Sequence, residues 1–381
     1  MKRTIPYGHQ WIDDDDIKKV VKVLKSDWIT QGLTVEKFEQ AIAKYSGAKY
    51  AVAVSSGTVA LHSAYAVAGI ASGDEVITSP LTFVATANSI VYCGGKPIFV
   101  DIDKDTLNID PKRIEKKITK KTKAIATVDF AAQPCDYDEI LKIAKKYKLL
   151  VIEDASHALG SEYKRRKIGS LADMTIFSFH PVKAITTGEG GMIVTNNKEF
   201  YEKLRIFRHH GIVKKPQKGG WYYEIEEIGY NYRLTDFQCA LGLNQMKKIN
   251  KFIKRRRQIV DKYNEAFKDV EEIIIPAERN YVKSAWHIYV IQLCLGKLKV
   301  GRRKIFEELR KNGLGVQVHY IPLHLQPFYR KKFSYKKGDF PIAEKYYERA
   351  ITLPLFPKMK DKDIEQVVFA VKQIINFNKL S

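Results

Sequence analysis

The sequence predicts an α/β protein with a mostly parallel central sheet covered by helices, plus a smaller C-terminal α+β domain. Through the first half of the chain, short and almost continuously apolar runs alternate with amphipathic helical patterns. This alternation is typical of parallel strands that are buried on both faces. Two further apolar runs, 173–179 and 190–196, are separated only by a loop, so one strand of the sheet is expected to be antiparallel. After Gly229 the pattern changes to long helices and a mixed tail.

The elements of the first half follow one another in a regular order. The first helix is predicted over residues 13–26, with aspartates at its positive N-terminal end. Its apolar residues share one face: Ile17, Val20, Val21 and Leu24. Five predicted strands come next. Four of them are each followed by a predicted helix: strand 50–55 by helix 58–69, strand 74–80 by helix 82–94, strand 96–103 by helix 111–118, and strand 123–130 by helix 137–147. The fifth strand is 149–156.

The second half of the chain predicts a separate, smaller unit. One or two long helices over 234–267 could bridge two domains. The tail continues with segments 286–293, 302–313, 314–320, 343–350 and 363–375. We place the boundary near residue 246, which gives a large domain over 1–245 and a small C-terminal domain over 246–381.

The composition is that of a globular protein with an unusual charge. The chain has 381 residues, 45% apolar and 28% charged, which is enough for a large core. The formal net charge is +22, and nucleic-acid binding would be one explanation. However, no basic stretch is interleaved with aromatic residues as a base-stacking surface requires. A lysine-rich solvated surface explains the charge better and would attract an anionic substrate, so no nucleic-acid partner is expected.

Three features concern the compartment. No stretch has the length of an uncharged membrane span, and the start of the sequence lacks the apolar core of a secretory signal. The cysteines are scattered, without the spacing of a metal site or the density of a disulfide scaffold: Cys93, Cys135, Cys239 and Cys294. We therefore expect a cytoplasmic protein with reduced thiols, no bound metal and no membrane partner.

Lys183 differs from the other lysines in its surroundings, the stretch SFHPVKAITTGEGG over 178–191. It follows the φ-fixing Pro181 by two residues and precedes a glycine-rich stretch that lets the backbone approach a ligand. A lysine whose charged form is disfavoured by burial is a nucleophile and forms Schiff bases, usually with pyridoxal phosphate (PLP). A PLP site also needs an acid for the ring nitrogen, a phosphate cup and a face over the ring.

A candidate acid and a candidate ring neighbour occur together. Asp154 lies near the end of the run 149–156, at the carboxyl end of a predicted strand, where ligands bind in open α/β sheets. A helix N-cap is an equally good interpretation of this aspartate taken alone. His157, one turn later, could pack on the cofactor, although a single histidine is more often a structural residue.

The phosphate cup and the aromatic face also have candidates. The stretch SSGTVAL over 55–61 opens a helix, where free N–H groups, Gly57 and Thr58 could hold a phosphate, although the same residues make an ordinary cap. Ser178 could add a hydroxyl. Phe83 could stack on the ring, but a core aromatic is the simpler interpretation of it alone. Together the candidates fall in the order phosphate cup, aromatic ring, aspartate and lysine, and this order favours one site.

Four stretches resemble the DegT/StrS-type PLP-dependent sugar aminotransferases. They are EDASHALG (153–160), SFHPVKAITTGEGGMIVTN (178–196), RHHGI (208–212) and GYNYRLTDFQCALGLNQM (229–246). The resemblance covers essentially the whole chain. It implies the PLP-dependent transferase fold type I and transamination of nucleotide-linked keto-sugars.

The resemblance implies roles for the matching residues. Lys183 would form the Schiff base with the cofactor, and Asp154 would pair with the ring nitrogen; these two are the expected catalytic residues. The other residues expected to bind PLP are Gly57, Thr58 and Ser178 at the phosphate and His157 and Phe83 at the ring.

The resemblance also implies a homodimer with shared active sites. Asn231 matches an asparagine that reaches the PLP phosphate of a partner subunit. The residues expected at the sugar-nucleotide pocket are Tyr7, Thr30, Gln31, Phe130, Arg233, His319 and Tyr320.

Within the family, residues 127–140 and 177–191 are most similar to the members of pseudaminic acid synthesis. Those members transfer an amino group from L-glutamate to C4 of a UDP-linked 4-keto-6-deoxy-N-acetylhexosamine. They often have glycine where this chain has Ala132, so a different turn near Phe130 would change the sugar pocket. Lys183 is intact here, whereas a related dehydratase has histidine in its place. Two alternatives stay open: another keto-sugar linked to dTDP or GDP, and, with much less support, a non-enzymatic nucleic-acid-binding or sensory protein.

Overall fold

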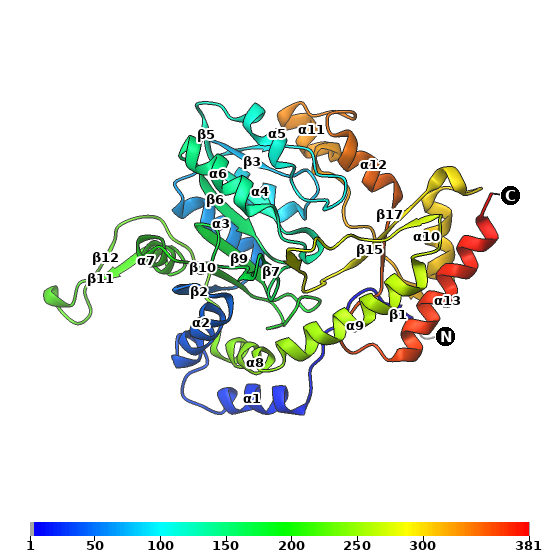
Figure 1. Ribbon diagram of the computed structural model, residues 1–381. Coiled ribbons are helices and arrows are strands. Elements are labelled where there is room, and N and C mark those ends of the chain that lie inside the picture. Colours follow the sequence, from blue (N-terminus) through cyan, green and yellow to red (C-terminus); the bar gives the residue numbers. More distant parts are fainter. Residues whose placement is uncertain (1–3, 381) are drawn as a thin grey trace.

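A seven-stranded sheet lies at the centre of the larger part of the computed structural model, which describes residues 4–380 (Figure 1). Its strands are β2 (Tyr50–Val54), β3 (Glu75–Thr78), β4 (Lys96–Phe99), β5 (Thr122–Val128), β6 (Leu150–Asp154), β9 (Met174–Ser178) and β10 (Gly191–Thr195). Their order is β2-β10-β9-β6-β5-β3-β4. Strand β10 is antiparallel to both of its neighbours, β2 and β9, and the other neighbouring pairs of this sheet are parallel, which confirms the predicted antiparallel member.

Helices cover both faces of this sheet, as the sequence predicts. One face carries α3 (Gly57–Val67), α4 (Val84–Tyr92) and α7 (Lys198–Phe207), and the other carries α2 (Leu33–Ser46), α6 (Tyr137–Tyr147) and α8 (Asp236–Met246). Successive residues of β6 belong to the two different cores, Val151 to one and Ile152 to the other. Because side chains alternate along a strand, a continuously apolar strand is the expected result of two covered faces.

The C-terminal part is a smaller α+β unit. Its antiparallel sheet contains β13 (Ile273–Ile274), β15 (Tyr289–Leu293) and β17 (Ala350–Leu353). The helices of this unit are α9 (Ile249–Phe267), α10 (Arg302–Lys311) and α13 (Asp361–Asn378). Within residues 4–380, no helix combines the length and apolar character needed to cross a membrane.

Several contacts cross residue 246, so the division into 1–245 and 246–381 stays a prediction. Strand β1 (Ile5–Pro6) pairs with β16 (Leu314–Gly315), and β7 (Glu162–Tyr163), whose other neighbour is β8 (Arg166–Lys167), pairs with β14 (Val282–Lys283). The helices α11 (Pro327–Phe333) and α12 (Pro341–Arg349) also contact the larger part. The hydroxyl of Tyr329 in α11 donates to Asn88 Oδ1 at 2.6 Å. The Asp101 carboxylate accepts from the N–H groups of Ile342 and Ala343 at the start of α12, both at 3.0 Å. These contacts fix the later segment on the sheet of the larger part.

A hairpin projects from the body of the chain, at the left of Figure 1. It consists of β11 (Ile212–Lys214) and β12 (Tyr223–Ile225). Trp221, between the strands, and Ile228, after them, are each 82% exposed. The sequence analysis predicts no element here.

The first helix, α1 (Asp14–Leu24), forms as predicted and begins with a capping box between Asp13 and Asp16. Its apolar face is open in the single chain, where Ile17 is 53% exposed and Leu24 is 52% exposed. The residue that α1 buries is Asp16, whose carboxylate accepts from three side chains: Asn244, Gln245 and Lys248. Polar contacts therefore attach α1 to α8 and the residues that follow it, and its apolar stripe stays uncovered.

Candidate active site

A cavity of about 380 Å³ lies where the carboxyl ends of β5, β6 and β9 meet the start of α3. The predicted residues that line it are Tyr7, Gly57, Thr58, Phe83, Asp154, His157, Ser178, Lys183, His319 and Tyr320. Parallel strands bring their carboxyl ends to one edge of a sheet, which is why residues far apart in the sequence meet here.

Asp154 is the buried acid of this cavity. Its Oδ2 accepts from the hydroxyl of Thr86 at 2.6 Å, and its Oδ1 accepts from Ser156 N at 3.1 Å. Thr86 lies in α4, and its hydroxyl is also 2.8 Å from that of Thr82, one turn earlier. A carboxylate oxygen accepts more than one hydrogen bond, so a protonated ring nitrogen fits as a further donor. The sequence analysis missed Thr86.

Lys183 faces the same cavity from the loop between β9 and β10. Burial lowers its pKa to about 8, although the nearby negative charge of Asp154 raises the pKa in opposition. About a tenth of this amine is therefore neutral at pH 7, far more than for an ordinary lysine, and the neutral form is the nucleophile. Burial makes this lysine reactive, and the negative charge of Asp154 compensates the positive charge of its protonated form.

The start of α3 is shaped to hold a phosphate. The Ser56 side chain caps Val59 N at 3.2 Å, and the earlier N–H groups of a helix, here those of Gly57 and Thr58, have no partner inside it. A Cβ atom at Gly57 would lie 3.0 Å from the Cβ of Ser178, so the absence of a side chain leaves room for an anion. The hydroxyls of Thr58 and Ser178 line the same cavity. The helix end provides N–H donors and a favourable dipole.

Aromatic rings surround the remaining space. Phe83 is 55% exposed at the start of α4, so its ring can be covered by a ligand. His157 is buried, and its Nε2 lies 3.3 Å from the hydroxyl of Tyr320. The pKa of His157 is well below its usual value, mainly because the ring is buried and to a smaller extent because of the positive charges of Lys183 and His319. The imidazole is therefore neutral.

His287 is a further residue of the cavity that the sequence analysis missed. Its ring centroid lies 4.3 Å from that of His157. The Nδ1 atoms of both rings are buried and have no hydrogen-bond partner within residues 4–380. A buried polar atom without a partner is rare in a folded protein, and a bound ligand is one explanation for it.

The residues predicted for the sugar pocket fall into separate groups. Tyr7 and His319 lie together, with ring centroids 5.4 Å apart, and burial followed by the charge of Lys183 lowers the pKa of His319 to about 4. Phe130 is buried behind the cavity, against the rings of His157 and Tyr320.

The turn after Phe130 has an unusual backbone. Ala131 has φ 56° and Ala132 has φ 75°. This left-handed region favours glycine because it has no Cβ. Alanine at position 132 therefore occupies a position where glycine would be less strained.

The other predicted residues do not reach the Lys183 cavity of the single chain. Gln31 and Arg233 line a second cavity of about 620 Å³ beside β11. Thr30 pairs with Thr235, and the exposed Asn231 pairs with His209. The turn at Thr30 and Gln31 is fixed from α8, because the Asp236 carboxylate accepts from Gly32 N at 2.7 Å and from Thr34 N at 3.0 Å.

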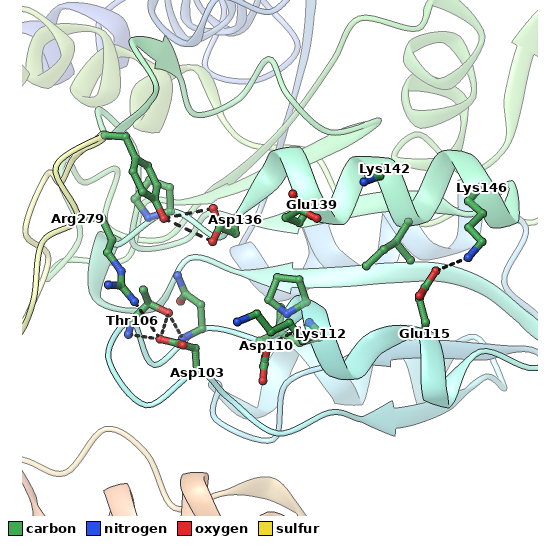
Figure 2. A pocket seen from close by; sticks show the side chains of 16 residues that line it. Asp103, Thr106, Asp110, Lys112, Glu115, Asp136, Glu139, Lys142, Lys146 and Arg279 are labelled. Carbon is green, nitrogen blue, oxygen red and sulfur yellow. Dashed lines mark hydrogen bonds and ion pairs between the residues drawn. The ribbon is translucent and has the colours of Figure 1, made fainter.

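A third cavity, of about 500 Å³, contains none of the predicted residues (Figure 2). Some of its charged side chains pair with one another: Lys146 with Glu115 at 2.8 Å, and Arg279 with Asp103 at 3.6 Å. The Tyr281 hydroxyl donates to Asp136 at 3.3 Å. Glu139 and Lys142 also line this cavity, and Figure 2 draws neither of them in an ion pair.

The Lys183 cavity therefore fits PLP: a reactive lysine, a buried acid, a phosphate cup and aromatic faces lie in one space on an α/β fold. These features define the site of a PLP-dependent enzyme. A sequence profile of the DegT/DnrJ/EryC1/StrS aminotransferase family matches residues 10–372, and the chain belongs to this family. It is a PLP-dependent aminotransferase, which removes the non-enzymatic alternative.

Named relatives cover nearly the whole chain. An uncharacterized protein of Methanocaldococcus jannaschii is 51% identical over 98% of this chain and 98% of its own. The spore coat polysaccharide biosynthesis protein SpsC of Bacillus subtilis is 44% identical over 97% of both chains. A UDP-4-amino-4,6-dideoxy-N-acetyl-beta-L-altrosamine transaminase of Campylobacter jejuni is 43% identical over 95% of both.

Solved structures share the fold. PseC of Helicobacter pylori, an aminotransferase of pseudaminic acid biosynthesis, superposes with a TM-score of 0.92 at 35% identity, over 98% of this chain and 100% of its own. A sugar aminotransferase of Streptococcus pneumoniae in its PLP form gives a TM-score of 0.93 at 32% identity, over 98% and 99%. The predicted fold type is confirmed.

The pKa of Lys183 leads to a testable pH dependence. The rate at which the cofactor-free protein combines with PLP should rise with pH and level off above about 8, because only the neutral amine attacks. In Asp154→Asn the midpoint should fall, since the lost charge no longer raises this pKa. Stopped-flow absorbance measures the rate, and Glu189→Gln, another carboxylate of the cavity, is the control. A midpoint near the ordinary lysine value of 10.5 would contradict this account of the site.

Proposed function

We propose that the protein transfers an amino group from L-glutamate to C4 of a UDP-linked 4-keto-6-deoxy-N-acetylhexosamine, giving UDP-4-amino-4,6-dideoxy-N-acetyl-β-L-altrosamine. The observation that carries the reaction is Lys183 in one buried cavity with Asp154. The sugar rests on likeness: relatives 43% and 41% identical have this transaminase name, and PseC has the same architecture.

Two side chains of this chain handle the protons of the reaction. When bound, PLP supplies an electron sink for the carbanion formed at the substrate carbon. The neutral Nζ of Lys183 removes the proton from Cα of glutamate and, in the second half of the reaction, the proton moves in the opposite sense at C4 of the sugar. With PLP bound, Asp154 would keep a proton on the ring nitrogen, and the hydrogen bonds from Thr86 and Ser156 keep the carboxylate in place.

Three of the four histidines of the cavity, His157, His287 and His319, add no positive charge. Burial holds the pKa values of His157 and His287 well below their usual range and that of His319 at about 4. Neutral imidazoles leave the Lys183 amine as the proton carrier. A neutral imidazole can also hydrogen-bond to a substrate hydroxyl and orient it, and because it has no positive charge it does not attract the nucleotide phosphates as a cation would.

We propose further that the protein is a homodimer with shared active sites. Thr30, Gln31, Asn231 and Arg233 lie outside the Lys183 cavity of their own chain. Gln31 and Arg233 line a cavity together with residues 212–214 of the projecting hairpin, whose Trp221 is largely exposed, and the apolar face of α1 is open. A second copy, related by twofold symmetry, would cover these surfaces and receive these residues in its cavity.

A second candidate is amination of another nucleotide-linked keto-sugar, carried by dTDP or GDP. It is favoured by the SpsC relative, whose name refers to a spore coat polysaccharide, and by the strained Ala131–Ala132 turn behind the pocket. Both candidates use the same Lys183 chemistry and differ only in the acceptor.

The choice of acceptor is testable with a panel of keto-sugars. L-Glutamate should bleach the visible absorbance of the purified yellow protein, and the UDP-linked 4-keto-6-deoxy-N-acetylhexosamine should restore it. The dTDP- and GDP-linked 4-keto-6-deoxyhexoses should restore it at least tenfold more slowly, because the site would lose contacts worth about 1.4 kcal/mol or more. Lys183→Ala, which cannot form the Schiff base, is the control. Faster recovery with a dTDP- or GDP-linked sugar would assign the second candidate instead.

Shared sites are testable by mixing inactive subunits. Lys183→Ala and Asn231→Ala homodimers should each have low activity, because every site lacks one residue. After subunit exchange, half of the dimers are hybrids with one intact site in two, so activity should return to about a quarter of wild type. No recovery, with exchange confirmed by native mass spectrometry, would contradict the shared site.

A further inference from the structure

Two buried carboxyl groups lie on the opposite side of β6 from the cofactor cavity. Glu153 precedes Asp154 in the strand, and alternation directs its side chain to the opposite face. Asp129 follows β5, and its N–H donates to the carbonyl of Asp154 at 3.1 Å. Asp129 and Glu153 are both 0% exposed.

Each carboxyl group is only half satisfied. Asp129 Oδ1 accepts from Cys135 N and from the hydroxyl of Tyr137, both at 2.9 Å. Glu153 Oε2 accepts from the hydroxyl of Thr175. The other two oxygens, Asp129 Oδ2 and Glu153 Oε1, are buried and receive no hydrogen bond from any donor within residues 4–380. The two carboxyl groups are near enough for the charge of Glu153 to raise the pKa of Asp129, and the Tyr137 hydroxyl and the backbone of Gly169 also lie near Glu153.

A single proton shared by the two carboxyl groups would remove their mutual repulsion and give both free oxygens a hydrogen-bond partner. Two ionised carboxylates this close together would repel each other and leave two buried oxygens unsatisfied, which is costly in a low-dielectric interior. If one is protonated, its O–H donates to the other and both oxygens gain a partner. Burial raises the pKa of Asp129, as does the charge of Glu153, and burial also raises the pKa of Glu153. The facing thiol of Cys135 and hydroxyl of Tyr137 stay neutral, because burial raises their pKa values too.

We propose that Asp129 and Glu153 share one proton at neutral pH and that this singly charged pair positions Asp154 for its role at the ring nitrogen. The backbone bond from Asp129 fixes the carbonyl of Asp154. The remaining negative charge adds to that of Asp154 in favouring a proton on the cofactor ring. A doubly charged pair would instead favour protonation of Asp154 itself. The proposal rests on the PLP site and not on the identity of the sugar.

The shared proton is testable by infrared spectroscopy of the holoenzyme. At neutral pH the wild-type protein should show the C=O band of a buried protonated carboxyl, and both Asp129→Asn and Glu153→Gln should lack it. Each amide can donate to the remaining carboxylate as the acid did, so the two single variants preserve shape and net charge. Asp138→Asn, at an exposed carboxylate, is the matched control and should retain the band. A band that survives in both single variants, or is missing in the wild type, would overturn the shared proton.

The positioning role has a separate spectroscopic test. The double variant Asp129→Asn/Glu153→Gln loses the negative charge, so the pH midpoint of the bound cofactor's visible absorbance should fall, whereas the single variants should match the wild type. A purely structural role would lower stability without moving this midpoint. If the double variant does not fold, Asp129→Asn/Glu153→Met is a second chargeless pair. A chargeless pair with the wild-type midpoint would overturn the positioning role. Failure of the sugar assay alone would leave both spectroscopic results unchanged.

Discussion

The active site depends on one buried negative charge, the carboxylate of Asp154 at the carboxyl end of β6. It is held by the Thr86 hydroxyl and by Ser156 N rather than exposed to water. Its charge partly offsets the effect of burial on Lys183 and keeps the pKa of that lysine at about 8. The same carboxylate is the natural partner of a protonated ring nitrogen. Nucleophile and cofactor are therefore both controlled from a single strand end.

The rest of the fold brings partners to this strand end. The parallel sheet supplies Asp154, the start of α3 supplies phosphate donors, and the C-terminal part supplies His287, His319 and Tyr320. Arg256 connects these parts from α9. Its buried guanidinium donates to the carbonyls of His287 and Leu355 at 3.0 Å and to that of Val182, beside Lys183, at 3.5 Å. One buried cation thus ties the lysine loop to the smaller unit.

The sequence predicts the sheet, its antiparallel strand and the residues of the Lys183 cavity, because these depend on local patterns and on strand ends. It misses Thr86 and His287. Thr86 is one of several hydroxyls in a helical pattern, and its role appears only when α4 is packed beside β6. His287 acquires its role by packing on a residue more than a hundred positions earlier. The hairpin β11–β12 is missed because each of its strands has only 3 residues, too few for a periodic pattern. The open face of α1 is missed because an apolar stripe does not say which chain covers it.

The central claim is that Lys183, among the many lysines of this chain, carries the cofactor. Reduction of the holoenzyme with borohydride, followed by digestion and peptide mass spectrometry, tests it directly. The account predicts a pyridoxyl phosphate group on the peptide that contains Lys183, with no comparable label on any other lysine. A label located on a different lysine, or a yellow protein that takes up no label, would contradict it.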